Sequence, residues 1–136
     1  AFGGEDLDAS VLLMAEIGFI DPMDPRYVAS VERIDEELRV GSHVYRYRME
    51  DDFGKPKTAF TACTFWHIDA LARVGRKEEA RAMFETVLAT RTKLGLLSED
   101  VDTETNELWG NFPQTYSMVG IINAASRLSK HWDETV

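Results

Sequence analysis

The hydrophobic pattern of this chain has a helical period almost throughout, and two kinds of segment alternate along it. Three segments are apolar on most sides, which is typical of helices that neighbours cover on more than one face. Two segments have one apolar stripe and one charged face, which is typical of helices at a protein surface. The apolar segments are 7–17, about 58–74 and about 113–128, and the amphipathic segments are 25–38 and 77–88.

This alternation constrains the architecture more than any single motif does. A single layer of helices would bury one face of every helix and would not alternate in this way. Two concentric layers would alternate, because inner helices are covered on both sides and outer helices face water. The sequence therefore predicts an all-α fold, a partial α/α toroid of about five helices. The alternative is an α-solenoid, since 75–84 resembles part of a tetratricopeptide repeat, although no repeat of 34 residues is found.

Residues typical of helix starts mark where the first two of these segments begin. Asp6 is expected to cap the first helix, and Asp24 followed by Pro25 to start the second. Between 41 and 57 the helical pattern is lost. Residues 44–48 alternate as a strand does and turn-forming residues follow, so we expect one long loop or a short hairpin there. Connections of this length in compact domains often carry functional residues.

Composition excludes several classes of function. The 136 residues carry 15 Lys and Arg against 24 Asp and Glu, a net charge of −9, whereas contacts to nucleic-acid phosphates need clustered basic side chains. No apolar run approaches the roughly 20 residues of a membrane span, and no signal peptide is visible. Cys63 is the only cysteine, so neither an intrachain disulfide nor a zinc site is expected. We therefore expect a cytoplasmic protein with no nucleic-acid or membrane partner, no metal and no cofactor.

The segment 95–113 is the strongest candidate for chemistry. It lies between the fourth and fifth predicted helices and carries five carboxylates, two aromatic residues and two glycines. A loop on a rigid helical scaffold can aim one carboxylate into a cavity, where it can act as a general base. The alternative is a solvated acidic loop in which Asp and Glu only cap turns. On composition alone, the solvated acidic loop is the favoured interpretation, because no specific motif supports a general base.

Motifs over most of the chain closely resemble glycoside hydrolase family 15, which comprises glucoamylases, glucodextranases and bacterial trehalase-like enzymes. The C-terminal end of that family is matched by 96–102, 110–117 and 120–125, and its bacterial branch by 7–10, 44–47 and positions within 59–76. The resemblance implies a barrel of six inner and six outer helices. It also implies that 1–136 is the C-terminal part of a single toroid catalytic domain whose N-terminal half is absent.

The resemblance further implies hydrolysis of α-linked glucosides, such as maltooligosaccharides, isomaltose or trehalose, with inversion at the anomeric carbon. The family's catalytic base maps onto Glu99, and Arg46 matches an arginine that lines the substrate pocket. Phe60 takes the place of a pocket tryptophan of fungal members, and Asp102 matches an acidic position of less certain role. Trp109 lies beside the expected base in sequence, so we expect it either to contact sugar or to close the loop against the helices.

Other aromatic and polar residues have a structural interpretation beside a functional one. Trp66 can stack on a sugar, but core packing is the expectation for an aromatic residue on a buried helix. His67 is expected to be a hydrogen-bonded interior histidine rather than a catalyst. Tyr45 and Tyr47 flank Arg46, and strand alternation predicts that both tyrosines point away from the arginine face.

A partial toroid has consequences for activity and association. The family's general acid lies in the part of the barrel that this chain does not match, so the chain alone is expected to be inactive. Uncovered inner helices expose an apolar patch, which favours self-association. Two alternatives are a non-catalytic helical-repeat interaction module and a family member that binds sugar without cleaving it. The location of Glu99 discriminates, because the enzyme interpretation places it on a concave face near Arg46.

Overall fold

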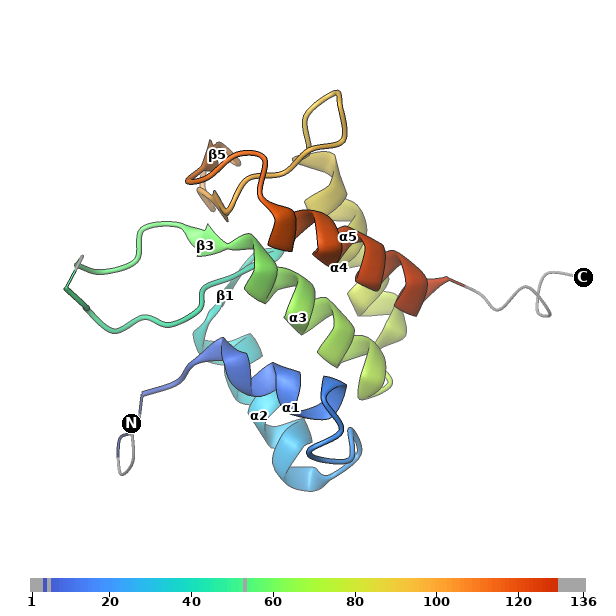
Figure 1. Cartoon of the computed structure of the whole chain (residues 1–136). Helices are drawn as coiled ribbons and strands as arrows, with labels where there is room; N and C mark the ends of the chain where they lie inside the picture. The colour runs from blue at the N-terminus through green and yellow to red at the C-terminus, as the bar shows by residue number, and fades with distance from the viewer. Residues whose placement is uncertain (1–3, 5, 53, 130–136) are drawn as a thin grey trace, which may run out of the picture.

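The computed structural model describes residues 4, 6–52 and 54–129, and within them the chain is mainly helical (Figure 1). The helices are the 3₁₀ helix η1 (Ala9–Leu12), α1 (Leu13–Glu16), α2 (Pro25–Glu37), α3 (Thr61–Arg73), α4 (Lys77–Ala89) and α5 (Thr115–Leu128). The strands are β1 (Arg39–Val40), β2 (His43–Val44), β3 (Ala59–Phe60), β4 (Asp100–Val101) and β5 (Leu108–Trp109). None of the described helices has the length and apolar character to cross a membrane.

Helix α3 forms the centre of the fold, with α4 and α5 packed on one side and η1, α1 and α2 on the other (Figure 1). Its sequence carries no charge before Asp69, and 10 of its 13 residues are buried. This confirms the prediction of a buried third helix. The helix begins at Thr61 rather than near Thr58, because Ala59 and Phe60 pair with strand β4 instead.

Helices α2 and α4 lie on the outside, as their amphipathic patterns predict. Their buried residues are Tyr27, Val31 and Ile34 in α2, and Ala80, Met83 and Val87 in α4. Asp24 caps α2 as predicted, since its carboxylate accepts a hydrogen bond from the main-chain N–H of Arg26 at 2.9 Å. The positions of α2, α3 and α4 thus follow the alternation in the sequence.

The first predicted helix differs from the expectation. In place of one helix over 7–17, η1 is followed by a single α-helical turn, and Asp8 rather than Asp6 caps it. The Asp8 carboxylate accepts a hydrogen bond from the Ser10 main-chain N–H at 2.8 Å. An uninterrupted apolar run is typical of a buried helix, but it does not determine whether each turn is 3₁₀ or α.

Helices α1 and α5 share an apolar face that no described element of the chain covers. Together with α3 they surround a pocket of about 510 Å³. The large apolar side chains exposed on α5, at the end of α1 and just after it are Ile17, Phe19, Tyr116, Val119 and Ile122. The prediction that the first and last helices are buried on most sides is therefore wrong for this face. We call these five residues the open apolar face.

Short strands form two small antiparallel sheets within the described residues, and helical periodicity did not indicate either of them. Strands β1 and β2 form a hairpin, and β3, β4 and β5 form a sheet in that order. The predicted alternation over 44–48 is wrong, because only Val44 of that stretch belongs to a strand. Strands of two residues are too short to leave a period of two in the sequence.

Candidate functional site

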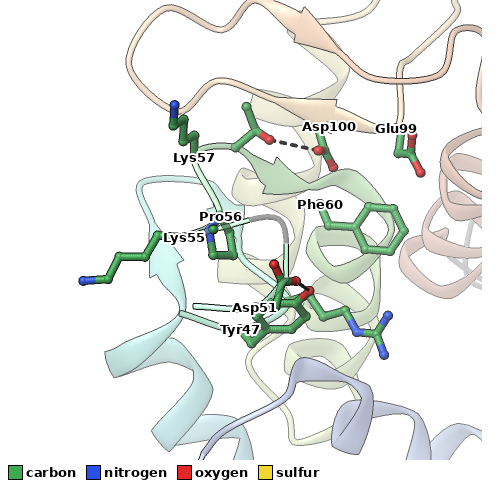
Figure 2. Close-up of a pocket in the computed structure, with 11 residues that line it drawn as sticks. Tyr47, Asp51, Lys55, Pro56, Lys57, Phe60, Glu99 and Asp100 are labelled. Atoms are coloured by element: carbon green, nitrogen blue, oxygen red, sulfur yellow. Dashed lines mark hydrogen bonds between the residues drawn. The ribbon is translucent and has the colours of Figure 1, made fainter. Parts of the chain in front are cut away.

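A pocket of about 850 Å³ lies beside strands β3 and β4 (Figure 2). One wall comes from the connection before β3, and the opposite wall comes from the end of β3 and the start of β4. Three of the residues singled out from the sequence line it together, namely Arg46, Phe60 and Glu99. Figure 2 shows Glu99 and Asp100 along one edge of the pocket, with the ring of Phe60 below Glu99. Residues more than 50 positions apart are thus gathered in one concave site.

Main-chain hydrogen bonds of the small sheet set the spacing between Phe60 and Glu99. Phe60 pairs with Asp100 in antiparallel register, and the N–H of Thr61 donates to the carbonyl of Glu99 at 2.9 Å. Since Thr61 is also the first residue of α3, the buried central helix and the Glu99 loop are joined directly. The aromatic side chain and the carboxylate are therefore held by backbone geometry.

The segment that carries Glu99 is fastened on its other side as well. The hydroxyl of Ser117, buried in α5, donates to the carbonyl of Ser98 at 2.7 Å. The main-chain N–H of Glu99 donates to the carbonyl of Asn111 at 2.9 Å, and the N–H of Asn111 donates back to Oε2 of Glu99 at 3.1 Å. Glu99 is partly buried. Its carboxylate is thus a positioned acceptor on the pocket wall.

Arg46 is placed by its contacts with the beginning of the chain. Its carbonyl accepts a hydrogen bond from the N–H of Ala9 at 2.8 Å, and its Nε donates to Oδ2 of Asp8 at 3.2 Å. Burial opposes ionisation of Asp8, but the hydrogen bonds from Ser10 and the charge of Arg46 outweigh it and lower the pKa of this carboxyl. The guanidinium remains about half exposed, so it can reach a ligand in the pocket.

Asp100 adds a second carboxyl group next to Glu99. Burial raises the pKa of Asp100, the hydrogen bond that Thr58 Oγ1 donates at 2.9 Å opposes the rise, and the negative charge of Glu99 adds to it. The pocket therefore combines carboxyl groups in different environments with a cation and an aromatic ring. Such a site can accept a proton from water and can bind the hydroxyl groups and the C–H face of a sugar.

Tyr47 lines the pocket, although the sequence argument excluded it. The prediction that Tyr45 and Tyr47 both point away from the arginine side is wrong for Tyr47, because 45–48 does not form a regular strand. The guanidinium carbon of Arg46 lies 5.9 Å from the centre of the Tyr47 ring, and the Tyr47 hydroxyl donates to Oδ2 of Asp51 at 2.5 Å. Tyr45 is buried. No periodic signal in the sequence could have found Tyr47.

Trp109 is not among the residues that line the pocket. It lies on β5, its side chain is about half exposed, and its indole N–H donates to Oε2 of Glu107 at 3.3 Å. Asp102 serves a turn, since its Oδ1 accepts main-chain hydrogen bonds from Glu104 and Thr105, both at 2.9 Å. These bonds lower the pKa of Asp102.

Trp66 and His67 on α3, for which the sequence favoured a structural role, have different surroundings. Trp66 is partly buried and meets the Phe60 ring edge-on, with ring centres 6.3 Å apart. His67 is fully buried, and its Nε2 lies 3.0 Å from Oδ1 of Asp35, which confirms the prediction of a hydrogen-bonded interior histidine. His67 does not line the pocket.

Comparison with known proteins identifies the family. The model of glycosyl hydrolases family 15 matches residues 1–126. The chain belongs to glycosyl hydrolase family 15. Among its relatives, a trehalase of Thermoplasma acidophilum is 37% identical over 130 residues, which are 95% of this chain and 22% of the trehalase. A trehalase of Mycolicibacterium smegmatis is 34% identical over 136 residues, which are 98% of this chain and 20% of that protein.

Solved structures agree with the family in fold. A glycosidase variant in complex with glucose superposes with a TM-score of 0.79 at 18% identity, and covers 93% of this chain and 37% of that chain. A wild-type glycosidase gives a TM-score of 0.78. The predicted all-α partial toroid is confirmed, whereas the solenoid alternative finds no support here. The chain spans about a fifth of the length of the curated family 15 relatives it matches.

Proposed function

We propose that this chain supplies the general base of an inverting hydrolase of α-linked glucosides within a complete family 15 enzyme. The observation that carries the proposal is that Glu99, Arg46 and Phe60 line one pocket. In this proposal, 1–136 is the C-terminal part of a single toroid catalytic domain. The rest of that domain contributes the general acid, so the isolated chain is inactive.

The proposed reaction needs two carboxyl groups. The acid protonates the glycosidic oxygen as the bond to the anomeric carbon breaks, while the base takes a proton from the water that attacks the opposite face of that carbon. In inverting enzymes the two groups are about 6.5–9.5 Å apart, which leaves room for the water. Glu99 is suited to the second role, because its carboxylate lies on the pocket wall and its main chain is fastened on both sides.

The other pocket residues serve binding in this proposal. The half-exposed guanidinium of Arg46 donates hydrogen bonds to sugar hydroxyl groups, and the ring of Phe60 packs on the C–H face of a pyranose. Sugar contact by Trp109 stays a prediction, since the residue lies outside the pocket lining in this chain. Trehalose is the favoured substrate among the α-glucosides, because the curated relatives named above are trehalases.

The anomers of the released glucose test the mechanism. Hydrolysis of trehalose with inversion at one anomeric carbon produces equal amounts of α- and β-glucose, because the leaving glucose keeps its α configuration. Proton NMR of the complete enzyme in the first minutes, before mutarotation, is expected to show both anomers in a ratio near one. Release of α-glucose alone would indicate retention and contradict the proposal. Binding of trehalose without any release would favour a member that binds sugar without cleaving it.

We further propose that the isolated 136-residue chain self-associates through the open apolar face. Size exclusion with light scattering is expected to show a mass above that of one chain, 15.4 kDa. Val119→Glu places a charge on this face, because Val119 lines the pocket between α1, α3 and α5 together with Ile17 and Tyr116, and it is expected to shift the chain toward the monomer. Ala82→Glu, on the exposed side of α4, is the matched control and should leave the mass unchanged. A parent chain that is monomeric and binds no apolar dye would contradict the proposal.

A further inference from the structure

A side chain at position 110 would crowd the side chain of Glu99. The φ of Gly110 is +76°, and a Cβ built on it would lie 2.9 Å from Oε2 and 3.0 Å from Cβ of Glu99. Distances this short between non-bonded atoms force one partner to move. The other described glycines with positive φ are Gly18, Gly41, Gly54, Gly75 and Gly95, and a Cβ at any of them would meet no atom within 4 Å.

The residue after Gly110 holds the same carboxylate. The main-chain N–H of Asn111 donates to Oε2 of Glu99 at 3.1 Å, and the carbonyl of Asn111 accepts the main-chain N–H of Glu99 at 2.9 Å. One peptide segment therefore binds both the main chain and the side chain of Glu99. Among the described residues, hydrogen bonds to the carboxylate are found only at Oε2, so Oε1 remains available to a ligand.

We propose that Gly110 and the main-chain amide of Asn111 form a cradle that fixes the Glu99 carboxylate and leaves Oε1 to receive the proton of the attacking water. Gly110 is thus a positioning residue that acts through Glu99. Because Gly110 has no Cβ, the Glu99 carboxylate has room beside it. The adjacent amide of Asn111 sets the orientation of that carboxylate. The inference rests on the proposed role of Glu99 as the base, and it adds the reason why the base requires glycine eleven residues further along the chain.

A small displacement of the carboxylate is expected to be costly for the reaction. The base must lie within hydrogen-bond reach of the water, and a misplacement of about 1 Å can lower a rate by about 100-fold. A methyl group at position 110 would compete with Oε2 for space and push the carboxylate away from the Asn111 amide. Sugar binding by Arg46 and Phe60 would be little affected, because neither depends on this contact.

The test compares Gly110→Ala with Gly95→Ala in the complete enzyme. Gly95 has φ +80° and open space around it, so its variant carries the same backbone penalty without crowding a carboxylate. We expect Gly110→Ala to lower kcat by about 10- to 100-fold with KM changed by less than about threefold. Gly95→Ala should keep the parent kcat. Parent kcat in Gly110→Ala, or an equal loss in both variants, would overturn the inference.

A second measurement does not depend on turnover. In a Glu99→Gly background both Oε2 and Cβ of residue 99 are gone, so Gly110→Ala should lower the Tm less than it does in the parent. An equal fall of Tm in both backgrounds would also overturn the inference. The outcome is distinguishable from failure of the proposed function. If Glu99→Gln is inactive and Gly110→Ala is fully active, only the cradle fails, whereas an active Glu99→Gln enzyme refutes the base role itself.

Discussion

Glu99→Gln is expected to abolish measurable hydrolysis of α-glucosides by the complete enzyme, a loss of at least about 10²- to 10⁴-fold in kcat. Glutamine has nearly the same shape and can still accept the Asn111 hydrogen bond through its amide oxygen. It cannot take a proton from water. The variant should therefore fold and bind sugar as the parent does, which calorimetric titration with trehalose and thermal unfolding can measure alongside the rate.

Glu104→Gln is the matched control, because it makes the same chemical change in the same acidic segment. Glu104 is exposed in the turn after β4 and lies outside the pocket lining. Its variant is expected to keep the parent kcat, which separates loss of the base from loss of one negative charge. Near-normal turnover in Glu99→Gln would rule out the role proposed for that residue.

Asp35→Ala is expected to destabilise the fold by about 2–4 kcal/mol, because it leaves the buried His67 without its partner and removes one of the two carboxylates, Asp35 and Glu79, that Arg39 and Arg76 share. Asp35 on α2 accepts from Arg39 at 2.7 Å and from Arg76 at 2.8 Å, and it also meets the fully buried His67 of α3. Nδ1 of His67 is buried with no hydrogen-bond partner, so the contact with Asp35 is the one that satisfies this imidazole within the described structure.

Urea unfolding at neutral pH measures this effect, with Glu32→Ala as the control. Glu32 lies on the exposed face of the same helix, and its removal should cost little. Equal free energies of unfolding for the two variants would contradict a structural role for the Asp35 contacts.

The same carboxylate makes stability depend on pH. Burial opposes its ionisation, but the hydrogen bonds from Arg39, Arg76 and His67 lower the pKa of Asp35 to about 2. A carboxyl whose pKa is lower in the folded state stabilises the fold above its unfolded pKa of about 4, and the contribution is lost as the pH falls toward 2. Asp35→Ala should therefore flatten the dependence of stability on pH in this interval. If the free energy of unfolding of Asp35→Ala changed with pH as steeply as that of the parent, the lowered pKa of Asp35 would not be the cause of this dependence.

The sequence predicts those helices in which the hydrophobic pattern extends over several turns. The stripe of α2 and the nearly uncharged run of α3 are long enough to show which faces are covered. The patterns of α1 and α5 predict helices covered on most sides, and they mispredict the face that the described residues leave uncovered. Strands of two residues leave no period at all, so the sheet that holds Phe60 beside Glu99 could not be inferred.

The candidate site was predictable only in part. The resemblance to the family singled out Glu99, Arg46 and Phe60, and these three share a pocket. Tyr47 was excluded by a strand that does not form, and Trp109 was included because it is near Glu99 in sequence. Proximity in sequence does not determine orientation, since the turn between β4 and β5 places Trp109 outside the pocket lining.

The pairing of β3 with β4 has a consequence for how the pocket can diversify. The distance between positions 60 and 99 is set by hydrogen bonds between main-chain peptide groups. Every amino acid supplies these groups, although proline lacks the N–H. The side chain at 60 can therefore be exchanged for another aromatic or a smaller residue without moving the carboxylate at 99. In the proposed enzyme, selectivity for different sugars can then change through the side chain at position 60 while the proposed base at position 99 keeps its place.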